Sequence, residues 1–334
     1  MDAANPEALL VVSFGGPESV DDVEPFLLRV TGGSGAPAHR VAQVAEHYRE
    51  LGGVSPLNQA NRGLIERLRA QAVARGLGES VYLGNRNCEP FMGDVMARMR
   101  EDGVRCASVF ITSAFSSYSG CRQYRENLYD ASAGHGIYLK VLPRFFDHTV
   151  LRDIWADRIV ESWPTGNPVL VFVTHSLPTA MAKGLGPGGG YLPQHRHLAR
   201  AVVAACSPRL ASPLPFRLAF QSRSGPPDQP WLEPDINEVV AQAADDGHDS
   251  CVVAPIGFCA ENLEIMWDLD VAAAQTAREH GVDFHRLALP QSDDRFVGMV
   301  WDLVRRYPRG HLCDPECCPN PRGARPATGD AKRT

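Results

Sequence analysis

Apolar residues occur along this chain in short, nearly continuous runs. Such runs are typical of strands buried on both faces of a parallel sheet, because a strand with one face in water alternates apolar and polar residues instead. Seven runs of this kind are found at residues 8–14, 80–85, 107–113, 169–175, 216–222, 251–258 and 284–289. The pattern therefore predicts strands buried in parallel sheets.

Segments in which apolar residues recur at helical spacing lie between these runs. The clearest are residues 41–51, 62–75, 91–101, 152–163 and 237–247. Strand then helix, repeated along the chain, predicts an α/β fold with doubly wound parallel sheets. Ligands of such folds bind beyond the carboxyl ends of the strands.

The chain divides into two similar halves. In the first half ALLVVSF leads directly into GGPES, and in the second VLVFVTH leads directly into SLPTA. We therefore expect two similar Rossmann-like domains, at residues 1–150 and 151–308. Residues 309–334 form a tail rich in Pro, Gly and Cys that apolar burial cannot order. Three cysteines within six residues of this tail point to a metal, and the chain after them is expected to be disordered.

Composition narrows the class of protein. The chain has 33 Lys and Arg against 39 Asp and Glu, a net charge of −6, which excludes a strongly basic nucleic-acid binder. Its mean hydropathy is −0.20, and no apolar run approaches the length of about 18 residues that a membrane span needs. The N-terminus does not resemble a signal peptide, so we expect a cytoplasmic, reducing location. Nine cysteines in such a location indicate metal ligands or reactive thiols rather than disulfides.

Two strand ends carry candidate chemistry. His175 ends one buried strand, where it could act as a base or metal ligand, or could cap a turn. Another strand is followed by Glu261, Glu264, Asp268 and Asp270, and the spacing of Glu264 and Asp268 predicts that they share a helix face. The group is either a solvated acidic face or a row of carboxylates that passes a cation or takes up protons. No phosphate-binding fingerprint follows any strand, which makes a nucleotide an unexpected ligand.

Six motifs together identify a family. They are SFGGPES, GGVSPLN, FSSYSGCRQY, THSLP, QSRSGPPDQPWLEPD and GFCAENLEIMWDLD, in this order within residues 8–310. In this combination the chain resembles the ferrochelatases, and in particular the actinobacterial coproporphyrin ferrochelatases. The resemblance implies that the protein inserts Fe²⁺ into coproporphyrin III to give iron coproporphyrin in haem biosynthesis. It also implies the next enzyme of the haem pathway as a possible partner.

The resemblance assigns site residues by their place in these motifs. His175 and Glu264 match the catalytic pair and would also be ligands of the substrate Fe²⁺. Asp268 matches the next acidic position, on the path of the cation, while Ser55 and Tyr124 match residues that contact porphyrin propionates. Metallation replaces two pyrrole N–H protons by a cation, so an imidazole and a carboxylate on opposite sides of the macrocycle could divide the work.

The chain departs from the family pattern at four positions. Asn262 replaces a histidine and cannot titrate, and Ala272 removes the third carboxylate of the acidic row. Glu18 stands where some relatives have a tyrosine that ligates iron, and Cys88 stands at a position that is commonly aromatic. These differences leave the axial ligand of the iron product open.

The same resemblance accounts for four of the nine cysteines. It implies a [2Fe–2S] cluster held by Cys121, Cys313, Cys317 and Cys318. The C-x₃-C-C spacing lacks the paired knuckles of a zinc ribbon, although zinc remains an alternative. The remaining cysteines are expected to be small buried hydrophobic residues.

Three other functions remain open. The protein could metallate protoporphyrin IX, or could insert cobalt into a corrin precursor. The segment at residues 31–51 is small and polar where membrane-bound protoporphyrin enzymes have an apolar lip, which favours a substrate with four propionates. A non-catalytic porphyrin or haem carrier would explain Asn262 and Ala272, but a carrier needs neither His175 nor Glu264.

Overall fold

The computed structural model describes residues 6–32, 38–75, 80–184, 186–210, 214–225 and 228–331. It contains two four-stranded sheets, and every strand pairing within them is parallel. The first sheet has the order β2-β1-β3-β4 and the second has the order β6-β5-β7-β8. In each half the strands therefore lie side by side in the same order, which is second, first, third and fourth along the chain. This confirms the two similar α/β halves.

The strands follow the apolar runs closely. Their bounds are β1 Ala8–Ser13, β2 Val81–Asn85, β3 Cys106–Ile111, β4 Tyr138–Val141, β5 Pro168–His175, β6 Phe216–Gln221, β7 Ser250–Ala254 and β8 Asp283–Arg286. β7 ends earlier than predicted, just before Pro255, which cannot donate a ladder hydrogen bond. β4 was not predicted, because it is a four-residue edge strand whose run includes Lys140 and whose first residue, Tyr138, is exposed.

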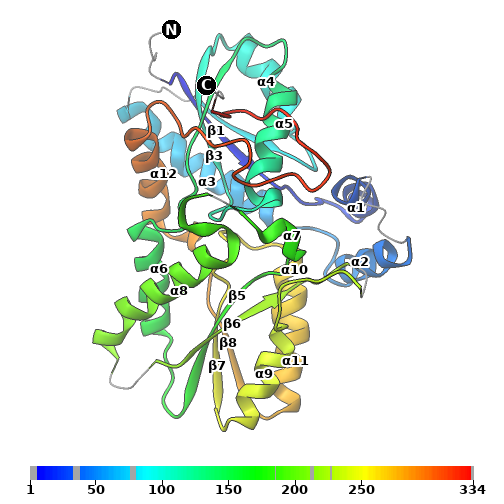
Figure 1. Ribbon diagram of the computed structural model, residues 1–334, viewed down its shortest axis with the longest axis vertical. Helices are drawn as coiled ribbons and strands as arrows, with labels where there is room; N and C mark the ends of the chain where they lie inside the picture. The colour runs from blue at the N-terminus through cyan, green and yellow to red at the C-terminus, as the bar shows by residue number, and fades with distance from the viewer. Residues whose placement is uncertain are drawn as a thin grey trace.

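Helices cover both faces of each sheet (Figure 1). Beside the first sheet lie α3 Pro56–Ala72, α4 Met92–Glu101, α5 Gln123–Ser132 and α12 Asp294–Arg306, and beside the second lie α6 Thr149–Glu161, α8 Tyr191–Cys206, α9 Ile236–Asp245 and α11 Ala274–Glu279. Figure 1 shows α6 and α8 on one side of the second sheet and α9 and α11 on the other. This is the doubly wound arrangement that the sequence predicts.

The remaining helices are short or lie at the edge of the molecule. They are α1 Val23–Thr31, α2 Ala38–Glu50, α7 Thr179–Ala182 and α10 Leu263–Ile265, with 3₁₀ turns at Val20–Asp22, Val73–Arg75, Pro187–Gly189, Ser207–Arg209 and Pro290–Ser292. Two segments are π-helical, Tyr118–Arg122 and Met266–Ala273. α1 and α2 project sideways from the first half towards α10 (Figure 1). π-helical segments are rare and are frequent at functional sites, which makes both segments candidate parts of such a site.

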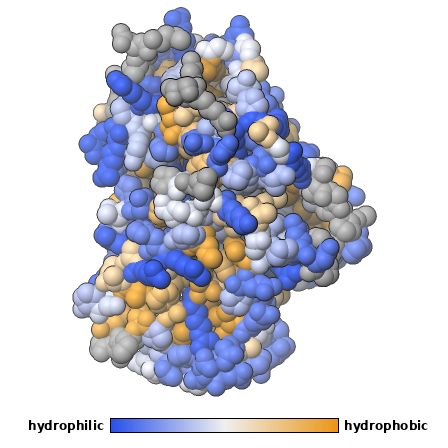
Figure 2. Space-filling model, viewed as in Figure 1, coloured by the Kyte–Doolittle hydropathy of each residue, from blue (hydrophilic) through white to orange (hydrophobic). Residues whose placement is uncertain are grey.

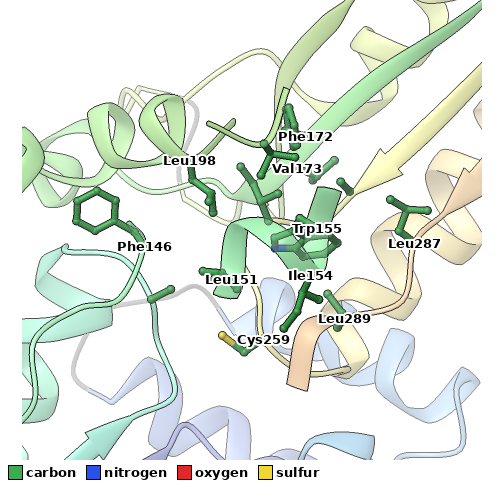
Figure 3. Close-up of a cluster of buried hydrophobic side chains, with 14 of the residues drawn as sticks. Phe146, Leu151, Ile154, Trp155, Phe172, Val173, Leu198, Cys259, Leu287 and Leu289 are labelled. Atoms are coloured by element: carbon green, nitrogen blue, oxygen red, sulfur yellow. The ribbon is translucent and has the colours of Figure 1, made fainter. Parts of the chain in front are cut away.

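One continuous core joins the two halves. Trp155 and Ile154 of α6 are fully buried between residues of the second sheet and α8, as the close-up in Figure 3 shows. The same cluster includes Phe110 of β3 and Phe296 of α12, whose rings meet edge to face at 6.2 Å. The last helix therefore packs on the first half, and the predicted boundary after residue 150 falls within the first turn of α6.

The Cys-rich tail returns to the first half and is held by polar contacts. The backbone N–H of His311 donates to the Val141 carbonyl of β4 at 2.7 Å. Further on, Asp330 accepts from the guanidinium of Arg122 at 2.5 Å, and the N–H of Thr328 donates to the Arg125 carbonyl at 3.0 Å. Ion pairs and backbone hydrogen bonds thus hold residues 319–331 in this structure in place of apolar burial, where the sequence led us to expect disorder.

Hydrophobic side chains gather on one face of the molecule, over the half that contains β5 to β8 (Figure 2). In the same half, Phe216 at the start of the edge strand β6 is 40% exposed. Within the described parts of the chain, no helix has the length and apolar character needed to cross a membrane. The polar segment predicted over residues 31–51 lies partly outside the described residues, since 33–37 are not among them.

Candidate active site

The candidate catalytic residues meet at the carboxyl ends of the second sheet. His175 is the last residue of β5, an inner strand that pairs with β6 on one side and β7 on the other. Glu264 lies in the first turn of α10, after the loop that follows β7. Parallel strands that end at one edge bring such loops together. The structure thus places the two residues side by side, as expected from their motifs.

The imidazole of His175 is held with its outer nitrogen facing the carboxylate. Its Nδ1–H donates to the carbonyl of Ser176, and its Nε2 lies 3.5 Å from Oε2 of Glu264. A carbonyl can only accept, so the proton of the neutral ring sits on Nδ1 and Nε2 keeps its lone pair. The side chains of His175 and Glu264 remain 30% and 36% exposed. Nε2 is therefore oriented as a base on a side chain that is partly open to a ligand.

The pair favours its charged form. Burial lowers the pKa of His175, but the hydrogen bond and charge of Glu264 outweigh this and raise it above the usual 6.5. Burial raises the pKa of Glu264, and the hydrogen bond and charge of His175 outweigh this in turn and lower it. A proton delivered to the pair therefore rests on His175 rather than on Glu264.

The two groups lie close together. A separation of 3.5 Å is a single van der Waals contact, and a flat ring between two atoms would need two such contacts. The pair would therefore have to move apart for a macrocycle to lie between the two groups, and their placement on its opposite sides stays a prediction.

Asp268 completes an acidic site behind this pair. Its carboxylate accepts from the hydroxyl of Ser222 and, at 3.3 Å, from the amide of Gln221. Burial raises the pKa of Asp268 to about 6, with the charge of Glu264 adding to it and the Ser222 hydrogen bond opposing it. Ser222 has φ of +62°, a conformation that non-glycine residues adopt rarely and that is common at functional sites. Asp268 is therefore poised to exchange a proton just below neutral pH.

The segment that carries the acidic residues differs from the predicted α-helix. α10 is only three residues long, and the chain continues as a π-helix from Met266 to Ala273. Asn262 begins the segment, and its side-chain oxygen accepts from the N–H of Ile265 at 3.0 Å. The residue that departs from the family's histidine is thus a helix N-cap, a position that asparagine favours.

Helices α1 and α2 of the first half pack against the start of the segment that carries Glu264. Tyr48 of α2 is buried with Leu263 in one apolar cluster, and burial, then the charges of Glu264 and Asp268, raise its pKa. The ring of His47 stacks on Trp267 of the π-helix at 3.9 Å between centroids. Sequence reasoning missed these contacts, because nothing local to α2 indicates a partner more than 200 residues away.

A buried hydrogen-bond chain supports the backbone of His175. The hydroxyl of Tyr191 donates to the His175 carbonyl at 3.0 Å and lies 2.6 Å from the hydroxyl of Thr174. Thr174 also contacts Nε2 of His195 at 2.8 Å. Burial lowers the pKa of His195 to about 3, so it stays neutral and serves the chain as a structural group. No residue close to His175 in the sequence predicts this support.

The two predicted propionate contacts, Ser55 and Tyr124, lie in the first half and are almost fully buried. Ser55 is 4% exposed and caps α3, where its hydroxyl accepts from the N–H of Leu57 at 3.4 Å. Tyr124 is 5% exposed, with the guanidinium of Arg86 over its ring at 4.6 Å. The structure does not bring these hydroxyls together with the His175 site through any direct contact, so their role stays a prediction.

The remaining departures from the family pattern also have partners. Glu18 pairs with Arg62 at 2.6 Å on the surface, and both side chains are about half exposed. Cys88 is 9% exposed, and its thiol lies 3.4 Å from the side-chain amide of Asn58, which donates to it. Burial raises the pKa of Cys88, which makes it a poor thiolate ligand.

Cavity size alone does not locate the site. A cavity of about 390 Å³ lies between α3, β2 and α4, and neither His175 nor Glu264 lines it. Charged groups of both signs surround it, and the catalytic chemistry is absent from its lining. The convergence of titratable groups at the strand ends is therefore the better guide.

The four predicted cluster cysteines come together at a second place. Cys121, Cys317 and Cys318 are buried against one another, and Cys313 packs against them. The sulfur atoms of Cys317 and Cys318 are 3.9 Å apart. In the described chain, no group of three or more His, Cys, Asp or Glu side chains has the arrangement to hold a single metal ion. The structure thus shows a thiol cluster but no cofactor site of the single-ion kind.

Positive charge surrounds these thiols. A hydrogen bond from Cys318, opposed by burial and supported by the charges of Arg144 and Arg125, lowers the pKa of Cys121. The Nε–H groups of Arg125 and Arg144 are buried without a hydrogen-bond partner. Both arginines, with Cys121, Cys313 and Cys317, line a cavity of about 110 Å³. Unsatisfied buried donors beside the Cys121 thiol, whose pKa is lowered, fit an anionic group.

Known proteins resemble this chain over nearly its whole length. The ferrochelatase family model matches residues 6–307. The coproporphyrin III ferrochelatase of Streptomyces coelicolor is 40% identical, with 99% of this chain and 98% of that protein aligned. Those of Mycobacteroides abscessus and Frankia alni are 40% and 43% identical, over 93% and 95% of this chain and 98% and 87% of theirs.

Two solved structures share the fold at low sequence identity. SirB from Bacillus subtilis with Fe³⁺ superposes with a TM-score of 0.53 at 12% identity, covering 89% of this chain and 94% of that one. CbiX, described as the terminal enzyme for siroheme biosynthesis in denitrifying bacteria, gives 0.51 at 14%, covering 90% and 98%. The family match and the identity of the relatives together show that this chain belongs to the ferrochelatase family.

Proposed function

We propose that this protein inserts Fe²⁺ into coproporphyrin III to give iron coproporphyrin. The relatives that it resembles over nearly full length bear that activity in their names. The observation that carries the proposal is the orientation of His175, whose Nε2 lone pair faces the carboxylate of Glu264 where both side chains are about one third exposed. A porphyrin metallase needs such a group, because two pyrrole protons must leave the macrocycle as the metal enters.

The residues divide this work in a defined order. Neutral His175 accepts a pyrrole proton at Nε2, and Glu264 stabilises the imidazolium that forms. Glu264 and Asp268 also attract the substrate Fe²⁺, for which carboxylates are weak, exchangeable ligands. Asp268, with its pKa of about 6, returns protons to solvent. The net change is two N–H protons released for each Fe²⁺ bound, with no change in oxidation state.

Ser55 and Tyr124 are proposed to contact the propionates of the substrate. Their hydroxyls can donate to carboxylates, and both sit beside loops at the carboxyl ends of the first sheet. Because both are buried, a propionate must enter the loop region to reach them. A carrier function is less favoured. The presence of Asn262 in place of the family's histidine is explained by its role as a helix N-cap, so it does not imply that catalysis has been lost.

We further propose that the four clustered thiols bind a [2Fe–2S] cluster. Cys121, Cys313, Cys317 and Cys318 would hold it, because these four thiols lie together where the tail meets the first half. Arg125 and Arg144 would satisfy their unpaired N–H groups on the anionic cluster. When bound, such a cluster can accept one electron, and it would add ordering energy to the tail.

A cysteine variant tests the cluster separately from activity. Cys313→Ser should yield colourless protein without cluster iron. Cys206→Ser should keep the colour and the iron, since Cys206 is buried at the end of α8 and is not one of the four clustered thiols. Visible absorbance and iron content of protein purified without oxygen provide the readouts. Full absorbance in Cys313→Ser would refute the ligand assignment.

The substrate is tested by direct metallation. Anaerobic protein is incubated with Fe²⁺ and either coproporphyrin III or protoporphyrin IX, and metalloporphyrin absorbance is followed. We expect turnover with coproporphyrin III and much slower turnover with protoporphyrin IX. The reverse preference would assign the protoporphyrin substrate, and no turnover with either would favour a carrier.

The setting of the reaction follows from the same proposal. None of the nine cysteines, all of them among the described residues, is in a disulfide, which fits the reducing cytoplasm. The iron coproporphyrin product still carries propionates, so the next haem-pathway enzyme is the expected recipient and partner.

A further inference from the structure

Arg286 ends β8, the edge strand of the second sheet, and its guanidinium reaches over the acidic segment. Its Nε and Nη2 donate to the two oxygens of Asp270 at 2.5 and 2.9 Å. Its Nη1 donates to both oxygens of Glu261 at 2.9 and 3.2 Å. The Arg286 side chain is 19% exposed, so these contacts are partly shielded from water.

The two carboxylates lie at the two ends of the segment that carries the site. Glu261 is three residues before Glu264, and Asp270 is two residues after Asp268. Between them lie α10 and the start of the π-helix, which open a helical stretch that runs without a break through α11 to Glu279. Glu264 is in the first turn of this stretch, where the backbone has few intrahelical hydrogen bonds, and π-helical hydrogen bonding is itself rare. Contacts from outside the stretch therefore help to fix the position of Glu264.

The backbone gives Arg286 a rigid base for this task. Arg286 is in register with Val253 of β7, and the N–H of the next residue, Leu287, donates to the Val253 carbonyl at 2.9 Å. β7 leads directly into the loop that carries Glu261. A planar guanidinium that binds one carboxylate through a two-point fork also fixes orientation, which a lysine cannot do.

We propose that Arg286 is a positioning residue for metal insertion, which clamps both ends of segment 261–270 and so holds Glu264 against His175. It has no direct contact with His175 or Glu264, and it acts through Glu261 and Asp270. Arg286 also distinguishes the carboxylates of the acidic row, because it pairs with Glu261 and Asp270 and offsets one of their two negative charges. Glu264 and Asp268 have no such ion pair with Arg286 and are left to handle Fe²⁺ and protons. This proposal rests on the proposed roles of Glu264 and Asp268.

The main test separates placement of Glu264 from general stability. Arg286→Gln should lower kcat about 10- to 100-fold, the usual effect of losing a group that orients a metal-handling side chain. The KM for coproporphyrin III should stay within about twofold, because the proposed propionate contacts lie in the other half. Arg295→Gln is the matched control, since Arg295 also joins two carboxylates, those of Asp157 and Asp293, away from the site. It should leave kcat and KM unchanged.

A variant cycle tests the route of the effect. The double variant Glu261→Gln with Asp270→Asn should lower kcat as much as Arg286→Gln, and combining all three changes should lower it no further. Arg286→Lys, which keeps the charge but not the fork, should give an intermediate kcat and guards against misfolding of the glutamine variant. An unchanged kcat in Arg286→Gln, or losses that multiply in the triple variant, would overturn the proposal.

One further variant distinguishes the two levels of the account. Glu264→Gln should abolish most turnover. If Glu264→Gln remains active, the proposed catalytic site is wrong. If Glu264→Gln is inactive while Arg286→Gln keeps full kcat, only the positioning role of Arg286 is wrong.

Discussion

Replacing Tyr191 with phenylalanine tests whether the backbone of His175 is held in place from behind. The substitution keeps the ring, which packs edge to face on Phe115 with 6.3 Å between centroids, and removes only the hydroxyl. That hydroxyl donates to the His175 carbonyl at 3.0 Å and lies 2.6 Å from the hydroxyl of Thr174. Tyr191 is 7% exposed, so water cannot readily replace the lost contacts.

The expected cost follows from which groups lose their partner. Thr174 keeps its contact with His195 at 2.8 Å, so its hydroxyl stays satisfied. The His175 carbonyl loses the Tyr191 donor, and a buried polar group left unpaired costs about 1–3 kcal/mol. Because the freed peptide carries the catalytic imidazole, kcat should fall about 10- to 100-fold, as is common when a reacting group shifts by about 1 Å.

Two measurements on the same samples check this prediction. Urea unfolding gives the change in free energy, and metallation of coproporphyrin III gives kcat for the folded protein. Tyr138→Phe is the control, because Tyr138 is 62% exposed on β4 and should change neither quantity. A Tyr191→Phe protein that loses stability but keeps full kcat would show that the hydroxyl supports the fold and does not position His175.

Two further predictions concern protonation and the tail. Turnover should rise with pH from about 6 upwards, because the pKa of Asp268 is about 6 and the pKa of His175 is raised, so that neutral His175 appears only at higher pH. Asp268→Asn should remove the part of the rise near pH 6, and a flat wild-type profile would contradict the assignment. Asp330→Asn should loosen the tail, because it removes the carboxylate that ties the tail to Arg122, which then keeps only Glu126 as an ion-pair partner among the described residues. Limited proteolysis should cleave residues 319–331 faster in this variant, and unchanged protection would contradict the polar anchoring.

Much of the fold could be predicted from the sequence, because buried parallel strands leave a strong local signature. The runs at residues 8–14 and 169–175 coincide with β1 and β5, the corresponding strands of the two halves. β4 was missed because it is short and at an edge. The order of the tail was missed because its stability comes from ion pairs with α5 and its flank, such as Arg122 with Asp330, and hydropathy does not register these.

Part of the candidate site could likewise be predicted from the sequence, and part of it could not. His175 and Glu264 could be found, since each follows an apolar strand within a recognisable motif. Their supports could not be found, because Tyr48, Tyr191 and Arg286 act across long sequence separations through side-chain geometry. The left-handed backbone of Ser222 gave no warning either, since serine carries no local preference for it.

The central claim is that His175 and Glu264 together perform porphyrin metallation. It is tested most directly by the initial rate at which anaerobic wild-type protein converts coproporphyrin III and Fe²⁺ into iron coproporphyrin, compared with His175→Ala and Glu264→Gln. The exposed His280, replaced with alanine, serves as the control. We predict turnover in the wild type and in His280→Ala, and a loss of about 100-fold or more in each of the other two variants. Normal turnover in His175→Ala or Glu264→Gln would contradict the claim.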